Sequence, residues 1–325
     1  MSNAIFLYFI FGLALIGFGA NYLVSSTEKL SKHFNISRFI SSFIFIGLAT
    51  SSPEILISIL SSFENNPNIA LGNALGSNIA NISLVFAISI LFIKVSEMNF
   101  KQGSNKEIIG FFIFLIIITF VTFIILMNGT LSRLNSIFLI FSLLPLFYLY
   151  KLFFYTNNDV KAMDDESKGS LSNIFFLFFV GLISLLVGTE LFLNSSIEIA
   201  KIVGISNYVV GLSITAVGTS LPELAASIES VRKKRIDFVV GNILGSNIFN
   251  ITLVIGLAGL ISPGGIMLQG YLPREMIMIF ITTIGLALAL YIIIKNYNWL
   301  ITKVLSLSLV VLFFAYQLSL YGISL

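Results

Sequence analysis

The sequence has no cysteine, one histidine and few charged residues. Without cysteine the chain can form neither a disulfide nor a thiolate metal site, and one histidine excludes a multi-histidine zinc or iron site. Charged residues make up 10% of the 325 residues, compared with about 25% in a typical soluble domain. Hydrophobic residues make up 57%, and the mean hydropathy is +1.01. The composition therefore indicates a polytopic membrane protein, and the net charge of +3 gives no reason to expect nucleic acid as a partner.

Ten segments are long and apolar enough to cross a bilayer, which takes about 20 residues of helix. We expect helices because open strands would leave backbone groups unsatisfied in lipid. The amino terminus has no basic region before its apolar stretch, so we expect a retained helix and not a cleaved signal. The predicted spans are residues 4–24, 38–62, 69–93, 107–127, 131–154, 172–194, 206–230, 236–260, 274–294 and 300–321.

Basic residues are distributed unevenly between the two sides of these spans. If the amino terminus is outside, 15 of the 18 Lys and Arg residues lie in inner loops, and only Arg133, Lys201 and Arg274 lie outside. This bias predicts that both termini are extracellular and that the mid-chain linker is cytoplasmic. We expect the chain to be integral to the plasma membrane.

The sequence contains a long internal repeat. Residues 49–54 (ATSSPE) match 218–223 (GTSLPE), and 72–81 (GNALGSNIAN) match 241–250 (GNILGSNIFN), always at a separation of 169 residues. Residues 11–37 align with 180–206 at the same separation. We predict a five-helix repeat over 1–155, a linker over 156–170 and a second repeat over 171–325. Because five is odd, the second copy enters the membrane from the opposite face, an architecture typical of alternating-access transporters.

Each copy places a carboxylate beside a helix-breaking proline inside a span. Pro53 and Pro222 remove a backbone donor and predict a break just before them, around 47–51 and 216–220. Glu54 and Glu223 are costly in lipid and are therefore functional candidates. Freed carbonyls, carboxylates and hydroxyls form an all-oxygen ligand set, which selects Na⁺, Ca²⁺ or Mg²⁺ over transition metals. The hydroxyls come from Thr50, Ser51, Thr219 and Ser220.

The following spans have a polar helix face. Ser77 and Asn81 lie four residues apart and share a face, and Ser246 and Asn250 repeat this pattern. Glycines spaced as small-xxx-small pairs allow close helix approach. A single copy could be explained as helix packing alone, but the duplication in register favours a paired cation site.

At these motifs the chain resembles the sodium/calcium exchangers of the cation/calcium antiporter superfamily, especially the compact prokaryotic members. The resemblance covers both halves and implies four cation positions at the membrane centre. It implies a Ca²⁺ position formed by Glu54, Glu223, Thr50 and Thr219. It implies an outer Na⁺ position formed by Ser77, the Ala216 carbonyl, Thr219, Ser220 and Glu54, and an inner one formed by the Gly47 carbonyl, Thr50, Ser51, Ser246 and Glu223. Asn81 and Asn250 would border the middle position.

The resemblance implies an antiporter that exchanges three Na⁺ for one Ca²⁺ and moves net charge. It implies no enzymatic activity and no cofactor besides the transported ions. The expected partners are Na⁺, Ca²⁺ and the lipid bilayer, and a monomer is the working expectation. Asn250 is neutral where some prokaryotic members and the potassium-dependent exchangers carry Asp. This leaves two carboxylates and predicts potassium-independent exchange.

Three other functions remain alternatives. A Ca²⁺/H⁺ antiporter on the same fold would be driven by a pH gradient without Na⁺. A cation channel would pass ions far faster than about 10³ per second, a typical upper turnover. An intramembrane hydrolase would need a base near its nucleophile, and no histidine or lysine lies near these motifs.

Overall fold

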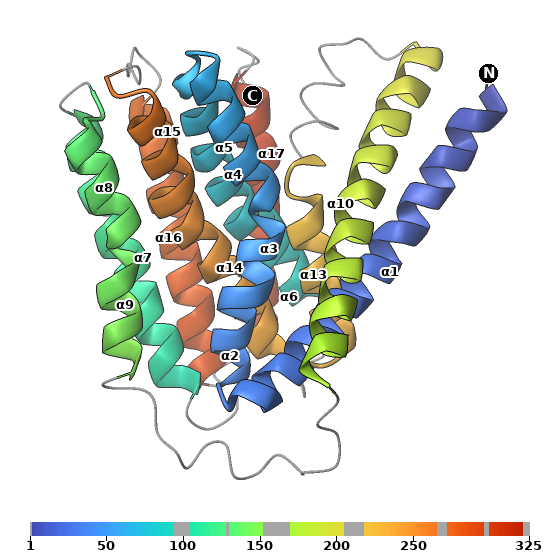
Figure 1. Ribbon diagram of the computed structural model, residues 1–325, viewed down its shortest axis with the longest axis horizontal. Coiled ribbons are helices and arrows are strands. Elements are labelled where there is room, and N and C mark those ends of the chain that lie inside the picture. The colour runs from blue at the N-terminus through green and yellow to red at the C-terminus, as the bar shows by residue number, and fades with distance from the viewer. Residues whose placement is uncertain are drawn as a thin grey trace.

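The computed structural model describes residues 2–93, 104–127, 130–151, 170–204, 218–264, 272–295 and 299–320. All regular secondary structure in these ranges is helical (Figure 1), which confirms the prediction of an all-α chain. The first half contains α1 (Ser2–Phe34), α2 (Arg38–Ser41), η1 (Ser42–Gly47), α3 (Leu48–Thr50), α4 (Ser52–Phe63), α5 (Pro67–Ala80), η2 (Asn81–Phe86), α6 (Ala87–Phe92), α7 (Ser104–Met127), α8 (Arg133–Phe141) and α9 (Leu143–Leu149), where η marks a π-helical segment. The second half contains α10 (Leu171–Ile202), α13 (Leu221–Arg232), α14 (Ile236–Phe249), η6 (Asn250–Val254), α15 (Ile255–Ile261), α16 (Leu272–Lys295) and α17 (Trp299–Leu320).

Among the described residues, seven helices are long and apolar enough to cross a membrane, or eight if the bent pair 38–50 and 52–63 forms one span. The predicted fifth span is a shorter apolar helix, Arg133–Tyr148. Residues 206–217 of the predicted seventh span lie outside the described residues. The count of ten spans therefore stays a prediction.

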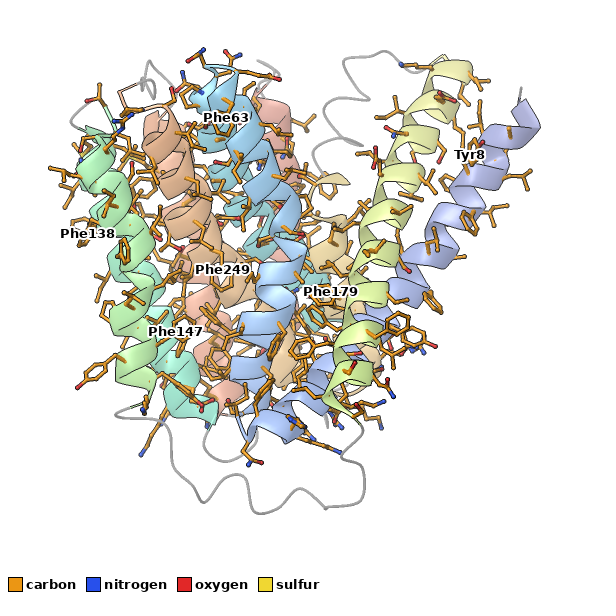
Figure 2. All side chains as sticks on the ribbon, viewed as in Figure 1. Tyr8, Phe63, Phe138, Phe147, Phe179 and Phe249 are labelled. Carbon is orange, nitrogen blue, oxygen red and sulfur yellow. The ribbon has the colours of Figure 1, made fainter. Side chains whose placement is uncertain are left out.

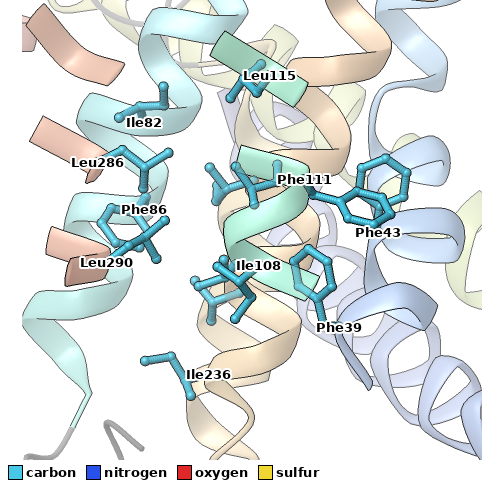
Figure 3. Close-up of a cluster of buried hydrophobic side chains, with 14 of the residues drawn as sticks. Phe39, Phe43, Ile82, Phe86, Ile108, Phe111, Leu115, Ile236, Leu286 and Leu290 are labelled. Carbon is cyan, nitrogen blue, oxygen red and sulfur yellow. The ribbon is translucent and has the colours of Figure 1, made fainter. Parts of the chain in front are cut away.

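The hydrophobic interior is rich in aromatic rings (Figure 3). Phe43 on η1 packs edge-on against Phe111 of α7, with ring centroids 4.7 Å apart, and lies 5.1 Å from the ring of Phe249 on α14. Phe86 on η2 is also fully buried in this cluster. Edge-on aromatic pairs add to the stabilisation from burial. This cluster joins helices of both halves into one core.

The outer surface is also apolar. Tyr8 and Phe138 lie at opposite edges of the helix array in Figure 2, and Tyr8, Phe63, Phe138 and Phe179 are each more than half exposed. Such a surface exceeds the scattered apolar residues of a soluble monomer. It is the surface expected of a protein whose helices face lipid.

Helices α1 and α10 cross side by side in antiparallel directions (Figure 1). A Cβ atom built on Gly12 would lie 2.9 Å from the Gly188 carbonyl oxygen, and one on Gly19 would lie 2.7 Å from the Gly181 carbonyl oxygen. The 169-residue separation relates Gly12 to Gly181 and Gly19 to Gly188. The contact is therefore self-complementary, as across a twofold axis.

Helix α1 begins, and α17 ends, at the same end of the helix array (Figure 1). At the other end, charged side chains connect α1 to α2 and to the turn before α14. The Arg235 guanidinium donates to Glu28 Oε1 at 2.7 Å, and Arg38 approaches the same oxygen at 3.4 Å. Lys233 Nζ donates to Asn21 Oδ1 at 2.7 Å. We call these contacts the Glu28 network.

Candidate functional site

The first repeat is broken where the proline predicts. The helices on either side of Ser51 are bent by 43°, and Ser51 has φ −80° and ψ 2°. Pro53 lies in the first turn of α4, where its missing N–H has no helical partner to lose. The carboxylate of Glu54 follows in the same turn and is fully buried. The predicted break between 47 and 51 is confirmed.

The second repeat has the same local structure before α13. Ser220 has φ −95° and ψ 9°, Pro222 lies in the first turn, and Glu223 is fully buried. Ala216 lies outside the described residues. Both carboxylates thus lie at the start of a helix, where the helix dipole stabilises negative charge. A buried charge nevertheless costs several kcal/mol unless it is paired.

Close approach of α2 and η1 to α14 brings the two repeats together. A Cβ on Gly241 would lie 2.5 Å from the Phe39 carbonyl oxygen, and one on Gly245 would lie 2.7 Å from the Phe43 carbonyl oxygen. A Cβ on Gly47 would in turn lie 3.1 Å from Gly245 Cα. Gly241 and Gly245, one of the two predicted small-xxx-small pairs, therefore allow a close crossing. A Cβ on Gly72 or Gly76, the other pair, would meet nothing within 4 Å, so close packing is not seen there.

Three of the residues predicted for the inner cation position meet at this crossing. Thr50 Oγ1 lies 3.4 Å from Ser246 Oγ, and each hydroxyl lies 3.4 Å from the Gly47 carbonyl oxygen. Thr50 also donates to Asn242 Oδ1 at 3.2 Å. Asn242 Nδ2 donates to the main-chain oxygen of Glu223 at 3.2 Å, so this amide links the inner hydroxyls to the helix that carries the second carboxylate.

The structure brings together fewer of the outer residues. Ser77 Oγ donates to Glu54 Oε1 at 3.3 Å, which places α5 beside the first carboxylate. Ser220 is buried, and its hydroxyl has no hydrogen-bond partner within the described ranges. Thr219 lies half-buried at the second break.

Most remaining oxygen atoms of the predicted site are buried without a donor in the described part of the chain. Carboxylate, hydroxyl and amide oxygens in this state are costly, and they are the ligands that hard cations prefer. Among residues with described positions, no three acidic, His or Cys side chains form a group. The donor-free atoms are Ser51 Oγ, Glu54 Oε2, Asn81 Oδ1, Ser220 Oγ, Asn250 Oδ1 and both carboxylate oxygens of Glu223.

The π-helical turns were not predicted from the sequence. Asn81 is the first residue of η2 and Asn250 the first residue of η6, each directly after a regular α-helix. π-helical turns are rare and are frequent at functional sites. The spacing of side chains in the sequence does not predict a π-helical turn. The structure shows that the two turns start at equivalent positions of the two repeats.

An all-helical array with an apolar outer surface and two buried carboxylates at helix breaks defines an integral membrane protein with a polar centre. A family model described as sodium/calcium exchanger protein matches residues 4–155 and 173–322. The chain therefore belongs to the sodium/calcium exchanger family, which confirms the resemblance noted in its motifs.

Individual relatives agree with this family. An uncharacterised membrane protein of Methanocaldococcus jannaschii is 32% identical over 290 residues, covering 89% of each chain. The sodium/calcium exchanger MaX1 of Methanosarcina acetivorans is 26% identical over 334 residues, covering 90% of this chain and 91% of its own. The solved structure of the sodium/calcium exchanger from Methanococcus jannaschii has a TM-score of 0.75 at 28% identity, covering 96% of this chain and 97% of that one.

Proposed function

We propose that the protein is a secondary active antiporter that exchanges Na⁺ for Ca²⁺ across the membrane by alternating access. The observation that carries this proposal is the pair of fully buried carboxylates, Glu54 and Glu223, among oxygen atoms with no donor in the described part of the chain. Family membership and the similarity to solved exchangers support the same function.

The cations are held by oxygen ligands from both repeats. Ca²⁺ binds between Glu54 and Glu223 with help from Thr50 and Thr219, because a divalent ion neutralises two carboxylates. The Gly47 carbonyl, already near Thr50 and Ser246, supports the inner Na⁺ position. Its other ligands are Ser51 and Glu223. The outer Na⁺ position is formed by Ser77, the Ala216 carbonyl, Thr219, Ser220 and Glu54, and Asn81 and Asn250 border the middle position.

The charge of the site determines how exchange responds to voltage. The two carboxylates carry a charge of −2. One bound Ca²⁺ makes the site neutral, whereas three bound Na⁺ give it a net charge of +1. A cycle of three Na⁺ for one Ca²⁺ therefore moves net charge across the membrane and responds to the membrane potential. Because no third acidic side chain joins Glu54 and Glu223 within the described ranges, we propose that exchange is independent of K⁺. We infer that Ca²⁺ leaves the cell as Na⁺ enters.

We propose that ten helices form two inverted repeats, residues 1–155 and 171–325, joined by the linker 156–170. The self-complementary packing of α1 on α10 supports this arrangement. The start of α1 and the end of α17 lie at one end of the helix array, and the turn from α1 to α2 lies at the other (Figure 1). The basic residues of the Glu28 network contact this second end of α1, which supports extracellular termini in the plasma membrane. Both carboxylates come from one chain, so a monomer suffices.

The test is uptake of radioactive Ca²⁺ into proteoliposomes that contain the purified protein. We expect uptake driven by an outward Na⁺ gradient, insensitive to K⁺, and lost in Glu54→Gln and Glu223→Gln. A valinomycin-clamped potential should change the rate if net charge moves. Uptake that needs a pH gradient and persists without Na⁺ would instead establish a Ca²⁺/H⁺ antiporter.

A further inference from the structure

Four asparagine side chains lie at the centre of the molecule, two from each repeat. Asn78 and Asn81 are on α5 and at the start of η2, and Asn247 and Asn250 are their equivalents at a separation of 169 residues. All four are almost fully buried. Because their sequences are repeated, symmetry predicts that the two pairs make the same contacts.

Asn78 connects the two repeats. Its Nδ2 donates to the main-chain oxygen of Asn247 at 3.2 Å, and its Oδ1 accepts from Asn250 Nδ2 at 3.1 Å. A main-chain carbonyl can only accept a hydrogen bond, so it determines which end of the Asn78 amide faces it. Oδ1 of Asn78 must then face Asn250, which must donate to it.

These two contacts determine the orientation of the Asn250 amide. Its nitrogen is used by Asn78, so its remaining polar atom is Oδ1, which is buried and has no donor in the described part of the chain. An amide oxygen is a good ligand for Na⁺ or Ca²⁺, whereas an amide –NH₂ repels a cation. If the amide rotated by half a turn, the repelling group would replace the ligand.

Asn247 and Asn81, the repeat equivalents of Asn78 and Asn250, do not make the equivalent hydrogen bonds. Asn247 Nδ2 donates to the Ile243 carbonyl of its own helix, at 2.7 Å. Neither polar atom of the Asn81 side chain has a hydrogen-bond partner within the described ranges. The repeat symmetry is therefore broken: Asn250 is held by another side chain, whereas Asn81 has no such partner within the described ranges.

We propose that Asn78 is a positioning residue that holds the Asn250 amide with its oxygen toward the middle cation position, next to the Ca²⁺ that Glu54 and Glu223 bind, so that this oxygen also contributes to Ca²⁺ binding. The proposal rests on the proposed function, because it concerns ligands of the same site. Asn78 need not touch the ion. It acts as the outer partners of metal ligands do, by orienting a ligand in advance.

A purely structural role is the alternative. A hydrogen bond between buried asparagines of two helices can simply join the helices. Such a bond would affect how well the helices hold together and leave the affinity for cations unchanged. The two roles therefore differ in what they predict for Ca²⁺ binding.

The test compares Asn78→Ala with Asn247→Ala. Both remove a buried amide of the same size from equivalent positions, but the Asn247 amide donates its described hydrogen bond within its own helix. For each purified protein we would measure the Ca²⁺ concentration giving half-maximal Na⁺-driven uptake, the maximal rate, and the Ca²⁺-dependent rise in melting temperature.

We expect Asn78→Ala to weaken Ca²⁺ binding by about 10- to 100-fold, as loss of an outer partner does at metal sites. Its maximal rate should change much less, and Asn247→Ala should resemble the wild type in both measurements. If Asn78 acts through Asn250, the double variant with Asn250→Ala should bind Ca²⁺ no more weakly than Asn250→Ala alone.

The proposal would be overturned if Asn78→Ala and Asn247→Ala changed the Ca²⁺ affinity equally. It would also be overturned by additive losses in the double variant, or by a lower melting temperature for Asn78→Ala with unchanged Ca²⁺ affinity. The melting measurement reports Ca²⁺ binding even in a variant that does not transport. If the wild type itself takes up no Ca²⁺ under a Na⁺ gradient and shows no Ca²⁺-dependent melting, the proposed function fails, and not the positioning role alone.

Discussion

The contact between α1 and α10 allows a sharp test of the helix arrangement. A Cβ atom on Gly19 would lie 2.4 Å from the main-chain nitrogen of Leu185, about 1 Å short of the 3.4 Å at which ordinary contact begins. The obstacle is backbone, which cannot rotate away, so in Gly19→Ala the two helices must move apart along the crossing. Overpacking of this kind costs about 1–3 kcal/mol, and the separation also weakens neighbouring dispersion contacts.

Gly17 supplies a matched control on the same helix. A Cβ there meets nothing within 4 Å, and alanine is the better helix former by about 1 kcal/mol. Gly188→Ala repeats the perturbation from the other helix, because its Cβ would lie 2.7 Å from the main-chain nitrogen of Ile16. We expect Gly19→Ala and Gly188→Ala to melt below the wild type, and Gly17→Ala to melt at or slightly above it.

The assay is the fraction of monodisperse protein left after heating in detergent, followed by size-exclusion chromatography. Equal melting of Gly19→Ala and Gly17→Ala would refute the close antiparallel crossing. If Gly19→Ala lowered the melting temperature and Gly188→Ala did not, the twofold symmetry of the α1–α10 crossing would be refuted.

Three further predictions concern the site and the Glu28 network. Glu223→Gln leaves a buried Ca²⁺ with one uncompensated charge, a cost of about 3–5 kcal/mol, so Ca²⁺ affinity should fall at least about 100-fold. Because this variant is not expected to transport, its affinity is measured from the Ca²⁺-dependent rise in melting temperature. Glu190→Gln, on the exposed side of α10, should leave the affinity unchanged. Asn250→Asp adds a third acidic group, so protons should compete with cations and uptake should fall at a higher pH than in the wild type. Arg235→Ala removes two half-buried hydrogen bonds to Glu28 and should lower stability by about 1 kcal/mol, seen as a lower melting temperature.

Each of these has an outcome that contradicts it. Wild-type Ca²⁺ affinity in Glu223→Gln would remove that carboxylate from the site. If uptake by Asn250→Asp and by the wild type had the same pH dependence, residue 250 would not belong to the cation site. For the network, Arg232→Ala is the control because its side chain is 76% exposed, and equal melting of the two arginine variants would mean that the bonds to Glu28 contribute nothing.

The sequence by itself determined the helical class, the break before Pro53, the paired carboxylates and the family. These properties follow from local chemistry: apolar runs partition into lipid as helices, proline breaks a helix wherever it occurs inside one, and an acidic residue in such a run stands out. The repeat could be read directly because its separation of 169 residues is constant. The ten-helix count and the full ligand set remain predictions.

Only the tertiary structure decided which groups meet. Thr50 and Asn242 are 192 residues apart and become hydrogen-bonded because glycines let η1 and α14 approach closely. The two repeats have nearly the same motif, so the sequence predicts equal roles for Asn78 and Asn247. In the structure the Asn78 amide donates across the repeats to the Asn247 carbonyl, whereas the Asn247 amide donates to Ile243 of its own helix. The direction of a hydrogen bond therefore breaks the symmetry, and that direction depends on the helix crossing and not on the motif.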